Sequence, residues 1–403
     1  MPRVVLVLPT ATYRATDFVL AAESLGVEVV VASEAAPPLA QSVVVDLDDA
    51  AAAAALLERF DDGRPIDAVV AVDDRGAVLA ATAAEQLGLP GNPPDAVAAT
   101  RNKVVMRGLL SSAEVAQPRF EVLERDDDVA AVAASVGFPV VIKPTGLAGS
   151  VGVIRADDPV AAIAAAERAW ALWDGPLLVE RFVGGPEVAV EGLLRDGRLE
   201  VLAIFDKPDA PDGPFFEETI YVTPSRHPRR VLDEVASLVS RACAAVGLVE
   251  GPVHAEARLA ATGPVLLEVA ARSIGGLCAR TLRFGAGISL EELILRHALG
   301  LRTDGMVREG SAAGVMMLPI PRSGVLREVR GQAEARAVPG VSGLELTIRP
   351  GRPVLALPEG DRYLGFLFAR GATPDEVEAS LRAAHAVLEI DIEDVPVEKG
   401  VEP

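Results

Sequence analysis

Residues 251–272 contain two runs of strand-like alternation separated by a short turn, and this pattern constrains the fold more than any other in the chain. The turn reads Ala-Thr-Gly and ends at Gly263, and a three-residue loop with a final glycine is a common hairpin connection. The resulting register places Glu256 directly opposite Glu268. Like charges in this arrangement destabilise a sheet, so the predicted hairpin needs a partner for its two carboxylates.

A hard divalent cation would remove this repulsion, because Mg²⁺ binds carboxylate oxygens together with the phosphates of a substrate. Glu256 and Glu268 therefore predict a metal–nucleotide site, in which Mn²⁺ could take the place of Mg²⁺. This prediction requires a nucleotide pocket elsewhere in the chain.

Composition excludes several classes of protein. The chain has 403 residues, half of them hydrophobic, and a net charge of −20. A nucleic-acid groove needs a basic face, so we expect no nucleic-acid partner. Cys243 and Cys278 are far apart in sequence, which favours two reduced thiols in a cytoplasmic protein. The apolar runs are too short for a signal peptide or a membrane span, so we expect no membrane partner.

Strand and helix patterns alternate over the first hundred residues, which predicts a Rossmann-like parallel sheet with helices on both faces. The expected strands are residues 4–8, 27–32, 43–47 and 66–72. Ligands of such sheets bind at the carboxyl ends of the strands, where the polar residues are Thr10, Thr12, Arg14, Asp73 and Asp74. No dinucleotide-binding G-x-G-x-x-G follows the first strand. We place the boundary of this α/β domain, residues 1–95, near a Gly-Asn-Pro-Pro turn.

Mixed strands and helices follow and predict an α+β architecture in two parts, a central subdomain over residues 96–183 and a C-terminal subdomain over residues 184–403. The expected helices are residues 101–110, 129–136, 159–173, 229–246, 289–299 and one that begins at Thr373. A long hairpin is expected over residues 187–205, with its turn at Asp-Gly. We expect the tail after Val395 to be frayed.

Lys143 follows an apolar strand and precedes the glycine-bearing segment 145–152. Phosphates need fixed positive charge and free backbone N–H groups, and Gly149 and Gly152 allow a close approach of the backbone. Ser150 adds a hydroxyl. These features favour a phosphate-binding loop, and a surface turn with a solvated lysine is the alternative. The lysine precedes the glycines, so this is not a Walker-type loop.

Two other segments could serve the same nucleotide. Lys103 is a second candidate cation on a predicted helix, where a solvated lysine is the ordinary alternative. The strand that runs into the bend at residues 184–186 can offer backbone groups to an adenine. Glu180 could take the amino group, Phe182 and Val183 could line the ring, and Glu187 could accept the ribose hydroxyls. An edge strand with an exposed hairpin is the alternative.

The order of these motifs resembles the ATP-grasp superfamily over nearly the whole chain. The resemblance implies two α+β subdomains that clamp ATP between their sheets. It implies that Lys103 and Lys143 contact phosphate and adenine-side groups, and that residues 145–152 form a lid over the phosphates. It implies that Glu256 and Glu268 bind magnesium. The nucleoside would be held by Glu180, Phe182, Val183 and Glu187.

One departure concerns the second metal strand, where many members carry Glu-x-Asn-x-Arg. Here Ala270 lies between Glu268 and Arg272 and cannot ligate a metal. Versions without the asparagine, with two glycines soon after the arginine, resemble the L-amino-acid ligase branch. Gly275 and Gly276 match those glycines. This resemblance implies small-molecule carboxylate and amine substrates, an acyl phosphate, and an amide product released with ADP and phosphate.

Further site residues follow from the hairpin and the loop before it. Arg272 could hold a substrate carboxylate or the tetrahedral intermediate, with a structural salt bridge as the alternative. His254 could orient Glu256 or touch the acyl site, or be purely structural. We expect Arg272, Lys143 and His254 to act in catalysis. Substrate contacts are expected from Arg272, Gly275, Gly276, Glu217, Glu218 and Tyr221. The alternative for Glu217 and Glu218 is a solvated loop, and the alternative for Tyr221 is an aromatic residue of the core.

Two other functions stay open on this sequence. One is another ATP-grasp ligase or carboxylase, of the purine-biosynthesis or biotin-carboxylase type. The other is a nucleotide-binding regulatory protein, which Ala270 favours because it weakens the metal site. A homodimer is the default assembly for a soluble enzyme.

Overall fold

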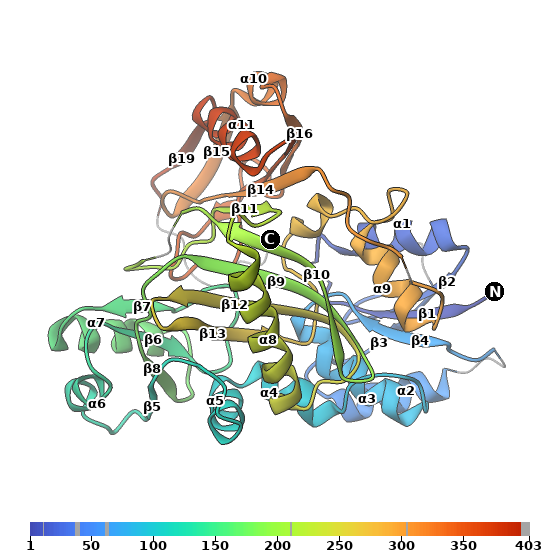
Figure 1. Ribbon diagram of the computed structural model, residues 1–403, viewed down its shortest axis with the longest axis horizontal. Coiled ribbons are helices and arrows are strands. Elements are labelled where there is room, and N and C mark those ends of the chain that lie inside the picture. Colours follow the sequence, from blue (N-terminus) through green and yellow to red (C-terminus); the bar gives the residue numbers. More distant parts are fainter. Residues whose placement is uncertain (11, 37–40, 61–63, 210–211, 304, 396–403) are drawn as a thin grey trace.

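The computed structural model describes residues 1–10, 12–36, 41–60, 64–209, 212–303 and 305–395 (Figure 1). Figure 1 shows the N-terminal elements at the right, a small sheet at the lower left, a long sheet between them and the last elements at the top. The tail predicted to fray beyond Val395 lies outside the described residues. None of the described helices is both long and apolar enough to cross a membrane.

The N-terminal sheet confirms the predicted parallel α/β architecture. Its strand order is β3-β2-β1-β4, and all neighbours are parallel. The elements are β1 (Arg3–Val7), α1 (Ala15–Leu25), β2 (Glu28–Ser33), β3 (Gln41–Val44), α2 (Ala50–Arg59), β4 (Ala68–Ala71), the short η1 (Asp74–Gly76) and α3 (Ala77–Gln86). Val5 and Val7 pack against α2 and α3, whereas Val4 and Leu6 share a core with α1. Alternate side chains of β1 therefore pack against helices on the two opposite faces of the sheet.

The small sheet has the order β5-β8-β6-β7 and packs on two helices. Its elements are β5 (Phe120–Leu123), α6 (Val129–Val136), β6 (Val140–Pro144), β7 (Ile154–Ala156), α7 (Pro159–Trp170) and β8 (Leu177–Arg181). The prediction that one helix begins at residue 101 and runs to residue 110 is wrong at its start. Two helices occur, α4 (Pro94–Arg101) and α5 (Lys103–Ser112), because Asn102 is extended and its side chain caps α5.

The long sheet is antiparallel, with the order β13-β12-β9-β10-β11-β14-β18-β16. Its strands are β9 (Glu187–Arg195), β10 (Arg198–Lys207), β11 (Ile220–Thr223), β12 (Gly251–Ala260), β13 (Gly263–Ala270), β14 (Ala312–Leu318), β16 (Val341–Leu346) and β18 (Gly365–Gly371). Helix α8 (Arg229–Val246) covers one face. The other face packs against α1 and α9 (Leu290–Ala298).

The last elements pack beside this long sheet. Helix α11 (Pro374–Ala386) lies against β14 and β18 and begins at the predicted Thr373 cap. A separate sheet of order β17-β15-β19 completes the described chain. The remaining elements are η2 (Cys278–Thr281), β15 (Gly324–Arg330), α10 (Gln332–Ala337), β17 (Pro353–Val354) and β19 (Glu389–Glu393).

The hairpin of β12 and β13 confirms that Glu256 pairs with Glu268, but the predicted turn is wrong. Ala260 pairs with Gly263, so the loop has two residues, and a β-bulge shifts the register at Leu267. The shorter loop and the bulge together restore the predicted register. The buried Arg107 guanidinium stabilises the bulge, because it donates to the carbonyl oxygens of Leu266 at 3.3 Å and Leu267 at 2.6 Å.

Candidate active site

A cavity between the small sheet and the long sheet collects most of the predicted nucleotide residues. Its lining includes Lys103, Lys143, Gly149, Ser150, Glu180, Phe182, Val183, Glu187, Glu256 and Glu268. We call it the nucleotide cavity. Gly152 lies outside this lining. Its N–H donates to the Pro358 carbonyl oxygen at 2.9 Å, and a Cβ there would lie 2.8 Å from Pro144.

Lys143 is held by a buried ionic group. Its Nζ lies 2.8 Å from Glu180 Oε2, and Arg107 Nε donates to Glu180 Oε1 at 2.7 Å. Burial alone would raise the pKa of Glu180, but the two cations outweigh it and lower that pKa. Both carboxylate oxygens thus have partners within the protein. Glu180 also lines the nucleotide cavity, and its contact with an adenine amino group stays a prediction.

The loop after Lys143 is tied to Lys103. Lys103 Nζ donates to the Leu147 carbonyl oxygen, and the backbone N–H of Lys103 donates to the Thr145 carbonyl oxygen at 3.0 Å. Gly149 and Ser150 both have left-handed φ angles, of 66° and 60°. A left-handed φ angle is unusual for serine, and such backbone strain is often found at ligand-binding sites. The loop lies over the nucleotide cavity, as a phosphate lid would.

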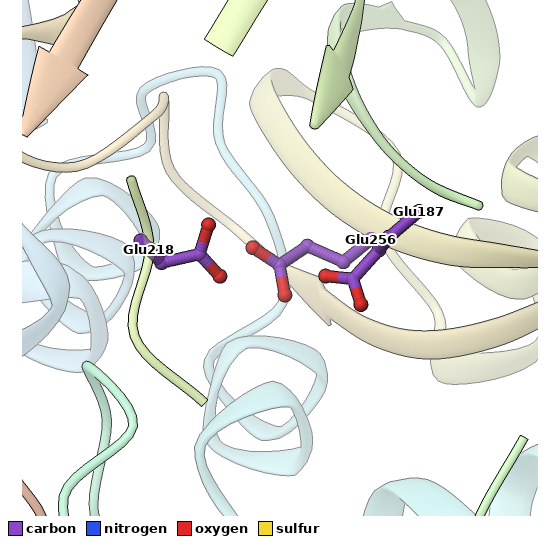
Figure 2. A group of neighbouring side chains, drawn as sticks. All are labelled: Glu187, Glu218 and Glu256. Carbon is purple, nitrogen blue, oxygen red and sulfur yellow. The ribbon is translucent and has the colours of Figure 1, made fainter. Parts of the chain in front are cut away.

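Three carboxylates approach one another at the end of the nucleotide cavity. Oxygens of Glu187, Glu218 and Glu256 lie within 4.8 Å of one another, and their side chains converge in Figure 2. Lys207 Nζ lies 2.6 Å from Glu187, 2.8 Å from Glu218 and 3.0 Å from Glu256. Burial would lower the pKa of Lys207, but these carboxylates raise it well above its usual value. Glu187 is therefore an ion-pair partner of Lys207 that also lines the nucleotide cavity, and its role at the ribose stays a prediction.

The donor set fits Mg²⁺. Glu256 and Glu268 face each other in register and line the same cavity, and carboxylate oxygens are its preferred ligands. Glu268 lies outside the group of three carboxylates around Lys207. Of the two predicted ligands, Glu256 is thus shared with a lysine, and Glu268 is the one open toward the lid residues.

His254 bridges two carboxylates. Its Nδ1 lies 2.5 Å from Glu191 Oε1, and its Nε2 lies 3.4 Å from Glu256 Oε1. Burial alone would lower the pKa of His254, but Glu191 and Glu256 raise it to about 9. Glu191 also accepts the Ile274 N–H at 3.0 Å. His254 is thus positioned to orient Glu256, which is one of the three possibilities that the sequence leaves open, and its part in catalysis stays a prediction.

Arg272 joins the hairpin to the N-terminal domain. Its Nε lies 3.1 Å from Asp74 Oδ1, which follows β4. Burial would lower the pKa of Arg272, but Asp74 and Glu268 raise it. Arg14 reaches the same region and donates to Ser273 Oγ at 2.7 Å. The structural salt bridge that the sequence left as an alternative for Arg272 is therefore present. The acidic partner of Arg272 comes from the N-terminal domain.

A second cavity, of about 220 Å³, adjoins the first, and we call it the acyl cavity. It contains the predicted residues Tyr221, His254, Arg272, Gly275 and Gly276. The two cavities share the lining residues Gly149, Ser150, Glu218, Glu256 and Glu268. Glu217 lines neither of them, and burial raises its pKa although an Ile320 backbone hydrogen bond opposes this. The shared wall is where a γ-phosphate and a substrate carboxylate would meet.

Known protein families match this chain along most of its length. Three family patterns occur in order: ATP-grasp N-terminal domain at residues 19–91, ATP-grasp domain at residues 136–281 and L-amino acid ligase C-terminal domain 2 at residues 316–393. A D-alanine–D-alanine ligase of Cupriavidus pinatubonensis is 30% identical over 236 residues, covering 55% of this chain and 70% of the ligase. The chain belongs to the ATP-grasp ligase family.

Two more relatives resemble this ATP-grasp protein over longer stretches. The crystal structure of the L-amino acid ligase from Bacillus licheniformis has a TM-score of 0.80 and 26% identity, and the match covers 98% of this chain and 99% of that one. The Sinorhizobium fredii protein y4rH is 29% identical over 312 residues, or 75% of this chain. That match spans 63% of y4rH, less than two thirds of its length.

Several residues of this ATP-grasp site were not identified from the sequence. Lys207, the last residue of β10, was not singled out. Glu191 and Arg107 were not singled out. The only available signal for Glu191 was its spacing of four residues from Glu187 on one strand, which places both side chains on one face. Arg14 and Asp74 were noted at strand ends, but nothing in the sequence indicated that they would reach Arg272 and Ser273.

Proposed function

We propose that this chain is an ATP-dependent carboxylate–amine ligase that activates an amino acid through an acyl phosphate. The observation that carries the proposal is the wall shared by the two cavities. One cavity carries two lysines and a glycine-rich loop, and the other carries an arginine. The shared residues Glu256 and Glu268 lie where a phosphoryl group would pass from nucleotide to carboxylate.

The reaction begins when a carboxylate oxygen attacks the γ-phosphorus of ATP and the bond to ADP breaks. The amine nitrogen then attacks the acyl carbon, phosphate leaves with the bonding electrons, and the nitrogen loses a proton. Magnesium held by Glu256 and Glu268 would neutralise phosphate charge. Lys103 and Lys143 stabilise the same charge, and Arg272 holds the carboxylate in line.

The lid over the nucleotide cavity keeps water from the reactive phosphate. Gly149 and Ser150 line both cavities, so one loop can cover the transferring group and its acceptor together. Two relatives are a D-alanine–D-alanine ligase and an L-amino acid ligase, which supports ligation of amino acids.

Phosphate release tests this function. The protein is incubated with ATP, Mg²⁺ and pairs of amino acids, and phosphate, ADP and product mass are followed. Amino-acid-dependent phosphate release is expected, with a product mass equal to the two amino acids less one water. ATP turnover without any condensed product, across a broad panel of carboxylates and amines, would sink the proposal. Light scattering after gel filtration tests the predicted homodimer.

A further inference from the structure

The acyl cavity is lined by two chemically distinct groups of side chains. One group is charged and comprises Glu218, His254, Glu256, Glu268, Arg272 and the largely exposed Asp361. The other group is apolar or aromatic, and we call it the apolar wall. It comprises Tyr13, Ile274, Cys278, Met317 and Tyr363. A substrate that fills this cavity must therefore carry charge at one part and apolar surface at another.

Three residues of the apolar wall belong to the protein core, and the two tyrosines lie at its edge. Cys278 Sγ lies 3.4 Å from Met317 Sδ, and Cys278, Met317 and Ile274 are all buried. Tyr13 and Tyr363 each contact the buried Phe366 ring edge-on, with ring centroids 5.8 and 5.9 Å apart. Because these side chains are fixed by core packing, the wall is preformed rather than built by the ligand.

Four separate segments contribute to this wall. Tyr13 comes from the loop between β1 and α1, Cys278 from η2, Met317 from β14 and Tyr363 from the loop before β18. None of them has a role in phosphoryl transfer. Their sulfur and ring surfaces suit contact with an aliphatic, thioether or aromatic group.

We propose that the apolar wall holds the side chain of the amino acid whose carboxylate is activated, and selects side chains of the size of leucine, methionine or phenylalanine. The inference rests on the proposed ligase function. A charged side chain would be desolvated against sulfur and ring carbons, and Asp361, the carboxylate two residues from Tyr363 in the lining, is itself largely exposed to solvent. A glycine or alanine would leave the wall unfilled, and each methylene in such a pocket changes discrimination about 10-fold or more.

Two adjacent methionines on β14 supply a matched pair of variants. Met317 and Met316 are both buried, but Met317 belongs to the core behind the acyl cavity and Met316 to the core under α11. M317A removes atoms from the apolar wall, whereas M316A removes the same atoms from the opposite face of the strand. C278A is a second and smaller change to the wall, in case M317A does not fold.

The experiment measures kcat/KM for a series of activated amino acids with one fixed amine. Fragment masses of the product identify the residue with the free amino group, which is the one whose carboxylate was activated. Wild type is expected to prefer leucine, methionine and phenylalanine over alanine by about 10-fold or more. M317A or C278A should shift the optimum toward larger side chains, and M316A should keep the wild-type ranking.

The outcomes separate this inference from the proposed function. If no amino acid supports condensation in wild type, the ligase function itself is wrong. If wild type condenses amino acids but favours charged or very small activated residues, the selectivity inference is overturned. The same holds if M317A and C278A keep the ranking seen in M316A.

Discussion

Lys207 Nζ lies 3.0 Å from Glu256 Oε1, so the carboxylate expected to bind magnesium already pairs with a buried ammonium group. The same nitrogen contacts Glu187 and Glu218. This arrangement stabilises three neighbouring carboxylates without a metal. It also leaves Glu268 as the predicted ligand with the least competition from protein cations.

Replacing Lys207 by methionine should make the folded protein depend on divalent cations. Without the ammonium, the buried Glu187 and the half-buried Glu218 and Glu256 repel one another, and breaking a buried ion pair costs about 3–5 kcal/mol. K207M should therefore melt at a lower temperature than wild type and regain more stability on addition of MgCl₂. Melting is measured with and without the salt. K207R, which keeps the charge, is the control, and equal melting of K207M and wild type would contradict the role given to Lys207.

The E268Q variant should need more magnesium for activity. A carboxamide keeps the shape of Glu268 but loses the charge that binds a hard cation. We expect the Mg²⁺ concentration for half-maximal phosphate release to rise by more than about tenfold. E200Q changes an exposed glutamate on β10 and should behave as wild type. Identical Mg²⁺ titrations of E268Q and wild type would remove Glu268 from the metal site.

Asp74 should act as a positioning residue for Arg272. D74N keeps the shape of the side chain but weakens the 3.1 Å ion pair, and a misplaced guanidinium can cost about 100-fold in rate. We expect a higher KM for the activated amino acid and an unchanged KM for ATP, with partial rescue in D74E. D48N alters an exposed aspartate and serves as the control. Equal rises in both KM values would point to a general structural defect instead.

The Glu180 ion pair should contribute stability that depends on pH. The folded-state pKa of Glu180 is lowered, so its contribution is present above the usual carboxyl pKa of 4.5 and is lost as the pH falls below that value. E180Q should be less stable than wild type by about 3 kcal/mol near pH 7. The difference should shrink as the solution is acidified. Urea unfolding at several pH values checks this, with E121Q on β5 as an exposed control. A difference that grows in acid would reverse the sign and refute the assignment.

Local sequence patterns predicted most of the elements. The helices over residues 129–136 and 229–246 occur with the expected bounds, and the Asp196-Gly197 turn of β9 and β10 is confirmed. Such features depend on caps, turn residues and hydrophobic periodicity, all of which are local. The Glu256–Glu268 pairing was also predicted, although the loop and the bulge that produce it were not.

Contacts between distant segments could not be predicted from the sequence. The partner of Arg272 lies 198 residues earlier in the chain, and the partner of Glu180 lies 73 residues earlier. No local pattern indicates which acid will meet which cation when several sheets pack together. Lys207 was missed for the same reason, since its three partners come from three different strands or loops.

The long sheet crosses the boundary between two of the matched family segments. β9 to β13 belong to the first segment, and β16, β18 and the last three residues of β14 belong to the second. Backbone hydrogen bonds between β11 and β14 join the two parts. An engineer who exchanged residues 316–393 between relatives would thus cut through β14, transplant β16 and β18, and with Met317 and Tyr363 move part of the proposed substrate pocket. Substrate preference and C-terminal segment should consequently be inherited together rather than as independent modules.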